Sequence, residues 1–128
     1  MTGGIQRENI LLNNIISIIK DMKGIDIMSL DLRKLENPIC EHFIICTGSS
    51  DTHTNAIEQK IKKQISELLK EKPWHTEGIN TGNWLLMDYS NIVVHIFQKN
   101  TRNFYQLEEL WGDAEITKHL SEKKILIA

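Results

Sequence analysis

The spacing of hydrophobic residues predicts three helices. The first runs from about Ile5 to Lys23, and Gly24 follows as a C-terminal stop. Its wide hydrophobic face favours packing under a sheet, with contact to a second copy of the chain as the alternative. The polar segment 48–52 then supplies several N-caps for a second helix. Its hydrophobic stripe comprises Ala56, Ile57, Ile61, Ile65, Leu68 and Leu69. The third helix is predicted over Thr101–Ala114.

Shorter hydrophobic runs predict strands between these helices. Asp26–Leu32 alternates between polar and apolar residues, and its two aspartates favour an outer strand. Glu41–Thr47 is rich in Ile and is typical of a central strand, whereas Trp74–Gly78 is typical of a short one. The order of elements predicts an α+β fold in which helices cover a mixed β-sheet.

The segment from Trp84 to Phe97 has the pattern of a β-hairpin. Ser90-Asn91 is a plausible two-residue turn, because Asn tolerates positive φ. One face of this hairpin would then be wholly apolar, with the pairs Tyr89–Ile92, Met87–Val94 and Leu85–Ile96. The other face would be mixed, with the pairs Trp84–Phe97, Leu86–His95 and Asp88–Val93. A mixed face of this kind is either covered by a helix or contacted by a partner.

Length and composition favour one folded domain. The chain has 128 residues, of which 41% are hydrophobic and 25% charged, so it has enough apolar residues for a core of its own. We assign residues 1–114 to this domain and expect 115–128 to be a short, loose polar tail. We also expect a cytoplasmic protein without membrane attachment, because no targeting segment is visible and only two cysteines are present.

The charge pattern argues against a protein that binds DNA or RNA mainly through phosphates. Such binding requires a basic excess, whereas the formal net charge here is −2. The lysines of the second helix are interleaved with glutamates, and no aromatic residue is spaced among them to stack on bases. We interpret them as a solvated helix face.

Candidate catalytic and metal-binding residues are sparse. In an extended strand the sulfurs of Cys40 and Cys46 would lie about 20 Å apart. The ligands of one zinc ion lie within about 4 Å of each other, so the two thiols cannot share an ion. Ser49, Asp51 and His53 lack a nucleophile-elbow sequence.

Phosphate binding is the remaining ligand chemistry. Gly48-Ser49-Ser50 stands before a helix, as in phosphate-binding turns, but without a Walker lysine. Asp88 has no second carboxylate beside it in the hairpin for two-metal catalysis. We predict no enzymatic activity, no cofactor and no metal. The alternative is a nucleotide-binding or nucleotidyltransferase-like enzyme that uses the Gly48-Ser49-Ser50 turn.

Several ordered blocks resemble the ribosomal silencing factor family (Iojap/RsfS) and together cover about residues 10–114. These blocks are Phe43–Ser50 with His53, Glu77-Gly78, Trp84–Tyr89, Val93–Phe97 and Phe104–Trp111. The chain departs from the family where Ser90-Asn91 replaces the usual Gly-Asp turn, where Glu41-His42 replaces Asp and its neighbour, and after Ala114. The resemblance implies a nucleotidyltransferase-like fold without the catalytic acids.

The resemblance also implies a function and a partner. Family members bind the fourteenth protein of the large ribosomal subunit at the inter-subunit face. They thereby block joining of the small subunit, repress translation when nutrients are short, and are linked to large-subunit maturation. A homodimer off the ribosome is also implied, and we expect contact with ribosomal RNA to be peripheral at most.

We predict that the mixed hairpin face and the segment after it form the partner-binding surface. Trp84 would be the aromatic anchor and Asp88 would meet a basic group of the partner. Arg102, Tyr105 and Glu108 would complete a polar rim, and Leu85 is included in the same set. The competing interpretation makes Trp84 a core residue and gives Tyr105 and Glu108 only local roles.

Overall fold

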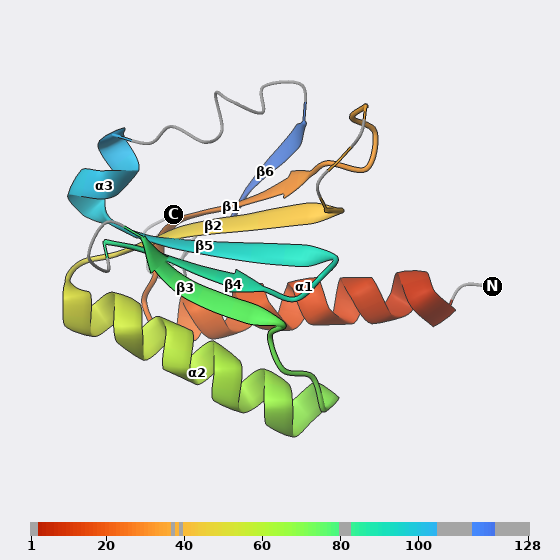
Figure 1. The fold of residues 1–128 in the computed structure, drawn as a ribbon, viewed down its shortest axis with the longest axis horizontal. Coiled ribbons are helices and arrows are strands. Elements are labelled where there is room, and N and C mark those ends of the chain that lie inside the picture. Colours follow the sequence, from red (N-terminus) through yellow and green to blue (C-terminus); the bar gives the residue numbers. More distant parts are fainter. Residues whose placement is uncertain (1–2, 37, 39, 80–82, 105–113, 120–128) are drawn as a thin grey trace, which may run out of the picture.

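The computed structural model of the protein describes residues 3–36, 38, 40–79, 83–104 and 114–119. Its helices and strands form an α+β fold, as the sequence predicts, with one mixed sheet (Figure 1). In chain order they are α1 (Gly3–Asp21), β1 (Ile25–Asp31), β2 (His42–Gly48), α2 (Asp51–Leu69), β3 (His75–Ile79), β4 (Trp84–Asp88), β5 (Ile92–Gln98), α3 (Lys99–Phe104) and β6 (Glu115–His119). None of the helices in the described ranges is long and apolar enough to cross a membrane.

Strands β2 and β5 pair in parallel at the centre of the sheet. The strand order is β3-β4-β5-β2-β1-β6, and every other neighbouring pair is antiparallel. Every residue of β2 is buried, as expected for a parallel strand that is covered on both faces. The prediction of a central strand in this segment is confirmed.

Helices α1 and α2 lie together on one face of the sheet (Figure 1). Isoleucines at helical spacing line the buried side of these helices, and five of them have no exposed surface: Ile15, Ile19, Ile57, Ile61 and Ile65. Burial of an isoleucine side chain contributes about 1.5–3 kcal/mol to stability. This helix-covered side is therefore the main core.

The first helix ends at Asp21, two residues before the predicted end at Lys23, and the left-handed residue that follows it is not the glycine. Lys23 has φ 64, and the N–H of Gly24 donates to the carbonyl of Ile19 at 2.9 Å. A Cβ on Gly24 would lie 2.4 Å from Ile19 Cγ2. Glycine is therefore required here by close packing on α1 rather than by its own backbone angle.

The hairpin of β4 and β5 has the predicted register, from Trp84 opposite Phe97 to Asp88 opposite Val93. Its two-residue turn is closed by the N–H of Tyr89 donating to the carbonyl of Ile92 at 2.8 Å. The positive φ falls on Ser90, at 76°, and not on Asn91 as the sequence suggested. Glycine is favoured at such a position.

The expectation of a loose tail from residue 115 is wrong for its first five residues. Glu115–His119 forms β6, which pairs with β1 and makes β1 an inner strand instead of the predicted outer one. Most of β6 is exposed, so it is held mainly by backbone pairing with β1. Its sequence therefore lacks the alternation that identifies a strand. The predicted helix over Thr101–Ala114 is confirmed only as α3, because residues 105–113 lie outside the described part.

Substitution of Ser90 by glycine should stabilise the protein, because glycine adopts positive φ without steric cost. We expect Ser90→Gly to raise the free energy of unfolding by about 0.5–1 kcal/mol. Urea denaturation measures the difference. The matched control is Asn91→Gly, which should give no such gain because Asn91 has no positive φ. A lower free energy of unfolding for Ser90→Gly would contradict this interpretation of the turn.

Candidate functional site

The sheet face opposite α1 and α2 carries a partly exposed row of side chains on β4. Along β4 the residues alternate between half-buried and buried, since successive side chains of a strand point to opposite faces. Trp84, Leu86 and Asp88 are the half-buried ones. We call these three residues the β4 face.

The indole of Trp84 is fixed by contacts with two residues of β5. It stacks on Phe97 with ring centroids 4.9 Å apart and an interplanar angle of 26°. Its Nε1–H donates to Nδ1 of His95 at 3.1 Å. Because the indole nitrogen only donates, Nδ1 must be the accepting nitrogen of a neutral imidazole. Trp84 is therefore held in one orientation while part of its surface stays exposed.

His95 lies beneath Trp84 and is only 5% exposed. Its ring also meets Phe43 edge-on, with centroids 4.7 Å apart, and Nε2 has no hydrogen-bond partner among the described residues. Burial lowers the pKa of His95 to about 4. The imidazole is therefore neutral at physiological pH and acts as part of the core that supports Trp84.

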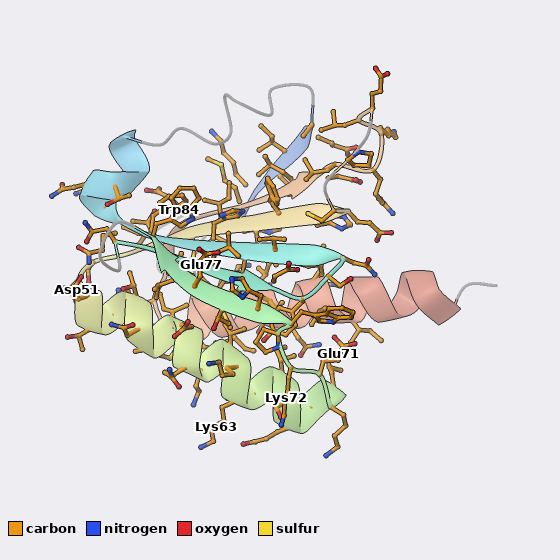
Figure 2. The ribbon with its side chains drawn as sticks, viewed as in Figure 1. Asp51, Lys63, Glu71, Lys72, Glu77 and Trp84 are labelled. Carbon is orange, nitrogen blue, oxygen red and sulfur yellow. The ribbon has the colours of Figure 1, made fainter. Side chains whose placement is uncertain are left out.

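Asp88 shapes the hairpin turn and also places a carboxylate at the end of the β4 face. Its Oδ1 accepts the N–H of Ser90 at 2.7 Å. On the neighbouring strand β3, His75 lies opposite Asp88 and Glu77 lies opposite Leu86. The His75 ring nitrogen Nε2 lies 3.0 Å from the Glu77 carboxylate. Figure 2 shows Glu77 and Trp84 on these adjoining strands. The edge of the β4 face is thus acidic.

Only part of the predicted partner-binding set comes together. Trp84 and Asp88 share the β4 face, whereas Leu85 is 7% exposed and packs in the helix-covered core. Its burial removes the Leu85 side chain from the proposed surface. Arg102 lies on α3, but its side chain is outside the description, as are Tyr105 and Glu108 entirely.

The surface also includes Leu86 and Glu77, which are not among the residues predicted by name for partner binding. The predicted hairpin register already places Leu86 on the mixed face between Trp84 and Asp88, and the alternation of β4 confirms that position. The same two-residue period puts Leu85, which was predicted by name, on the apolar face. Glu77 required the pairing of β3 with β4, which the sequence pattern did not specify.

The Gly48-Ser49-Ser50 turn uses its polar groups within the chain. The N–H of Ser49 donates to Nδ1 of His53 at 2.9 Å, and the N–H of His53 donates to Ser50 Oγ at 3.1 Å. Since Nδ1 accepts, Nε2–H is the donor to the carbonyl of Met22 at 2.6 Å. A phosphate would have to compete with these bonds, so the geometry favours a structural turn that ties α2 to the end of α1.

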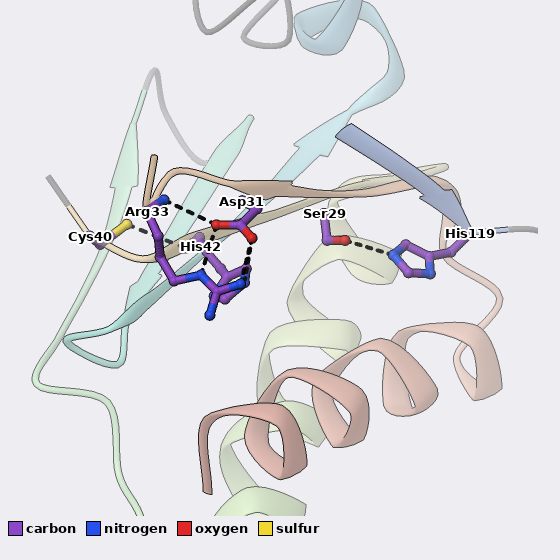
Figure 3. A network of polar contacts seen from close by, with 6 residues as sticks. All are labelled: Ser29, Asp31, Arg33, Cys40, His42 and His119. Atoms are coloured by element: carbon purple, nitrogen blue, oxygen red, sulfur yellow. Dashed lines mark hydrogen bonds and ion pairs between the residues drawn. The ribbon is translucent and has the colours of Figure 1, made fainter. Parts of the chain in front are cut away.

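A second polar cluster lies where β1 ends and β2 begins (Figure 3). Arg33 binds the Asp31 carboxylate with two side-chain hydrogen bonds, of 2.9 and 2.6 Å. These bonds hold the pKa of Asp31 down at about 2. The Cys40 thiol donates to the carbonyl of His42 at 3.3 Å, and burial raises the pKa of Cys40 to about 11. Such a thiol is a poor nucleophile at neutral pH.

Metal ligands do not gather in the described part of the chain. No group of three or more His, Cys, Asp or Glu side chains there is placed to hold an ion. Cys40 and Cys46 belong to the cores on opposite faces of the sheet. Separation across the sheet therefore adds to the distance argument against a site shared by these two residues.

Comparison with known proteins identifies relatives of the whole fold. The model of the family described as "Ribosomal silencing factor during starvation" matches residues 5–126. The ribosomal silencing factor RsfS of Bacillus subtilis is 38% identical over 97 residues, which cover 75% of this chain and 80% of the relative. A crystal structure from Chromobacterium violaceum is similar with a TM-score of 0.75 and 27% identity, and covers 88% of this chain and 92% of that one.

A more distant relative carries a name that concerns the ribosome. It is the "Mitochondrial assembly of ribosomal large subunit protein 1" of Mus musculus, 26% identical over 102 residues. The match covers 78% of this chain and 44% of the mouse protein. The similar region is therefore less than half of that longer protein.

Burial of His95 should make the protein less stable in mild acid. The unfolded chain binds a proton near the ordinary pKa of 6.5, whereas folded His95 binds one only near 4. The resulting stabilisation is complete above pH 6.5 and is lost as the pH falls from 6.5 to 4. The total loss is about 3 kcal/mol. Urea denaturation at several pH values measures it.

The variant His95→Gln keeps an acceptor for Trp84 but does not titrate. It should lose about 3 kcal/mol less than the wild type between pH 7 and pH 4. The control Gln59→Asn changes an exposed residue that carries no titratable group and should retain the wild-type pH dependence. An unchanged pH dependence in His95→Gln would show that His95 is not the titrating group.

Proposed function

Because the chain belongs to the ribosomal silencing factor family, we propose that it represses translation by occupying the large ribosomal subunit. In this proposal it binds the fourteenth protein of that subunit at the inter-subunit face. Its bulk then prevents the small subunit from joining when nutrients are limiting. A related role in large-subunit maturation is part of the same proposal.

The β4 face is the observation that carries this proposal. Trp84 is held by Phe97 and His95 and is still only half-buried. An aromatic side chain that is already fixed loses little conformational entropy on binding, and tryptophan is common among binding hot spots. Leu86 extends the apolar contact, and a patch of this kind fits a protein partner.

The charge at the edge of this face supports a basic partner. Asp88 and Glu77 are carboxylates on adjoining strands, one at the end of the β4 face and one beside Leu86. Opposite charges across an interface increase the rate of association and select against acidic partners. Ribosomal proteins are commonly basic because they pack on RNA phosphates. The face and the proposed partner are therefore complementary.

Obstruction is the mechanism that these features support. A factor that excludes another particle needs a surface that binds and a volume that fills space. It needs no reacting group at the interface. The mouse relative is named for assembly of the large ribosomal subunit, which supports that subunit as the binding partner. Off the ribosome, we propose a cytoplasmic homodimer, whose mass light scattering would measure.

Loss of the β4 face should strongly weaken binding to the large subunit. We expect the double variant Trp84→Ala/Asp88→Asn to bind at least about 30-fold more weakly, because it removes a hot-spot anchor and a charge. Co-sedimentation with separated subunits measures binding, and light scattering of subunit mixtures measures joining. The wild type should sediment with large subunits alone and inhibit joining.

A matched double variant controls for this experiment. Ile116→Ala/Glu115→Gln also removes one hydrophobic side chain and one carboxylate, but from exposed positions on β6 at the other edge of the sheet. It should bind and inhibit as the wild type does. Wild-type binding by the β4 double variant would show that another surface is used.

Binding to the large subunit should weaken only gently with salt. Contacts with a protein partner depend on packing and a few charges, whereas contacts with RNA phosphates release many counterions. We expect the logarithm of the association constant to fall with a slope shallower than about −2 against the logarithm of salt concentration. A slope steeper than about −4, measured by sedimentation at several salt concentrations, would indicate binding mainly through RNA.

A further inference from the structure

An open cavity of about 650 Å³ lies beside the second half of α2, remote from Trp84 along the β3–β4 edge of the sheet. One wall comes from α2 and the other from the segment that leads into β3. Its lining residues are Lys62, Lys63, Ser66, Glu67, Lys72, Pro73, Trp74, His75 and Thr76. We call this cavity the α2 pocket.

Trp74 is the most exposed large hydrophobic residue among those described, at 82%. Its backbone is nevertheless well anchored, because its N–H donates to the carbonyl of Asp88 at 2.7 Å and so extends the β3–β4 pairing. Pro73 precedes it and restricts the chain further. An indole on a fixed backbone at the wall of an open pocket is a flat, available stacking surface.

Three lysines line the same pocket as this indole. Lys62 and Lys63 come from α2, and Lys72 follows the end of that helix, where Lys70 adopts the left-handed conformation. None of the three pocket lysines forms an ion pair with another described residue. Figure 2 shows Lys63 and Lys72 at the same end of the molecule.

Glu67 is the only acidic residue among the described residues that line the α2 pocket. Counted by the same convention as the net charge of the whole chain, in which histidine carries no charge, these residues carry three positive charges and one negative charge, a balance of +2. The whole chain carries −2. Positive charge is therefore concentrated locally, at the place where the exposed indole lies.

We propose that the α2 pocket binds an unpaired nucleotide of RNA. The base stacks on Trp74, and the phosphates on either side of it contact Lys63 and Lys72. Aromatic stacking combined with lysine–phosphate contacts is the general chemistry of single-strand binding, and it tolerates any base. No buried polar atom without a partner lies among the described lining residues, so we expect binding to be independent of sequence.

The structure supplies the aromatic residue that the sequence pattern lacked. Along the chain, Trp74 follows the lysines of α2 and does not alternate with them. The turn at residues 70–73 folds it back against the helix. A contiguous RNA strand is favoured over a free nucleotide, because separate lysines can then contact successive phosphates.

This site goes beyond the proposed function and does not depend on it. Trp74 and Trp84 lie at opposite ends of the β3–β4 pair, since Trp74 bonds to Asp88 and Trp84 lies opposite Ile79. RNA binding can be measured with purified protein and no ribosome. Failure of one proposal therefore leaves the other intact.

Fluorescence anisotropy with a labelled eight-nucleotide oligouridylate tests the proposal at low salt. Trp74→Ala should weaken binding about 5- to 150-fold, the range for loss of one stacked base. Lys63→Glu should weaken it and reduce the slope of log K against log salt by at least about 0.7, the value for one phosphate contact. Uridine monophosphate should compete far less well than the oligomer.

The control Lys118→Glu makes the same change in net charge on β6, at the opposite edge of the sheet. It should bind RNA as the wild type does. Equal loss in Lys63→Glu and Lys118→Glu would overturn the proposal, because binding would then follow net charge alone. Wild-type affinity in Trp74→Ala would overturn it too.

Two further outcomes would assign the pocket differently. Equal affinity for the monophosphate and the oligomer would identify a free-nucleotide site and overturn the RNA assignment. No RNA binding, together with a smaller particle mass for Trp74→Ala in light scattering, would identify a contact between copies of the chain. Circular dichroism verifies that each variant is folded, as expected for a position as exposed as Trp74.

Discussion

The parallel pairing of β2 with β5 holds the structure together, and the features with functional meaning are arranged around it. The seven residue pairs run from His42–Ile92 to Gly48–Gln98. On one face of these strands α1 and α2 form the larger core. On the other face β5 presents His95 and Phe97, on which Trp84 is supported. The shape of the β4 face therefore depends on the pairing of β2 with β5, although the residues of the β4 face lie on another strand.

The contact of Trp84 with His95 joins this core to the surface. An imidazole that is buried and neutral can accept the indole N–H, and the indole in turn covers the imidazole. His95 thereby supplies a hydrogen-bond acceptor for the indole N–H, and Trp84 shields the imidazole from solvent. This explains why a side chain on a proposed binding surface also has the packing of a core residue. The sequence allowed Trp84 to be either a binding anchor or a core residue, and in the structure the same side chain has core packing and an exposed surface.

Sequence patterns predicted those parts of the molecule that local rules determine. The register of the hairpin followed from a two-residue turn and from alternation, and the same alternation separates Leu86 from Leu85. Strand β6 was not predicted. It is held by backbone hydrogen bonds to β1, and because most of its side chains are exposed, its sequence has no hydrophobic alternation. The presence of Trp74 and Lys63 in the lining of one pocket was not predicted, because it depends on how the turn at residues 70–73 folds, and spacing along the chain does not contain that information.

The chain order of the central strands has a consequence for biosynthesis. Residue 42 emerges 50 positions before residue 92, its partner across the parallel pair. Until then the growing polypeptide carries a strand that is rich in isoleucine and has one open edge, which is a template for aggregation. Completion of the core must therefore wait until β5 has left the exit tunnel. A nascent chain of this design depends on protection, by a chaperone or by the tunnel itself, while the 50 residues that separate the two strands are made.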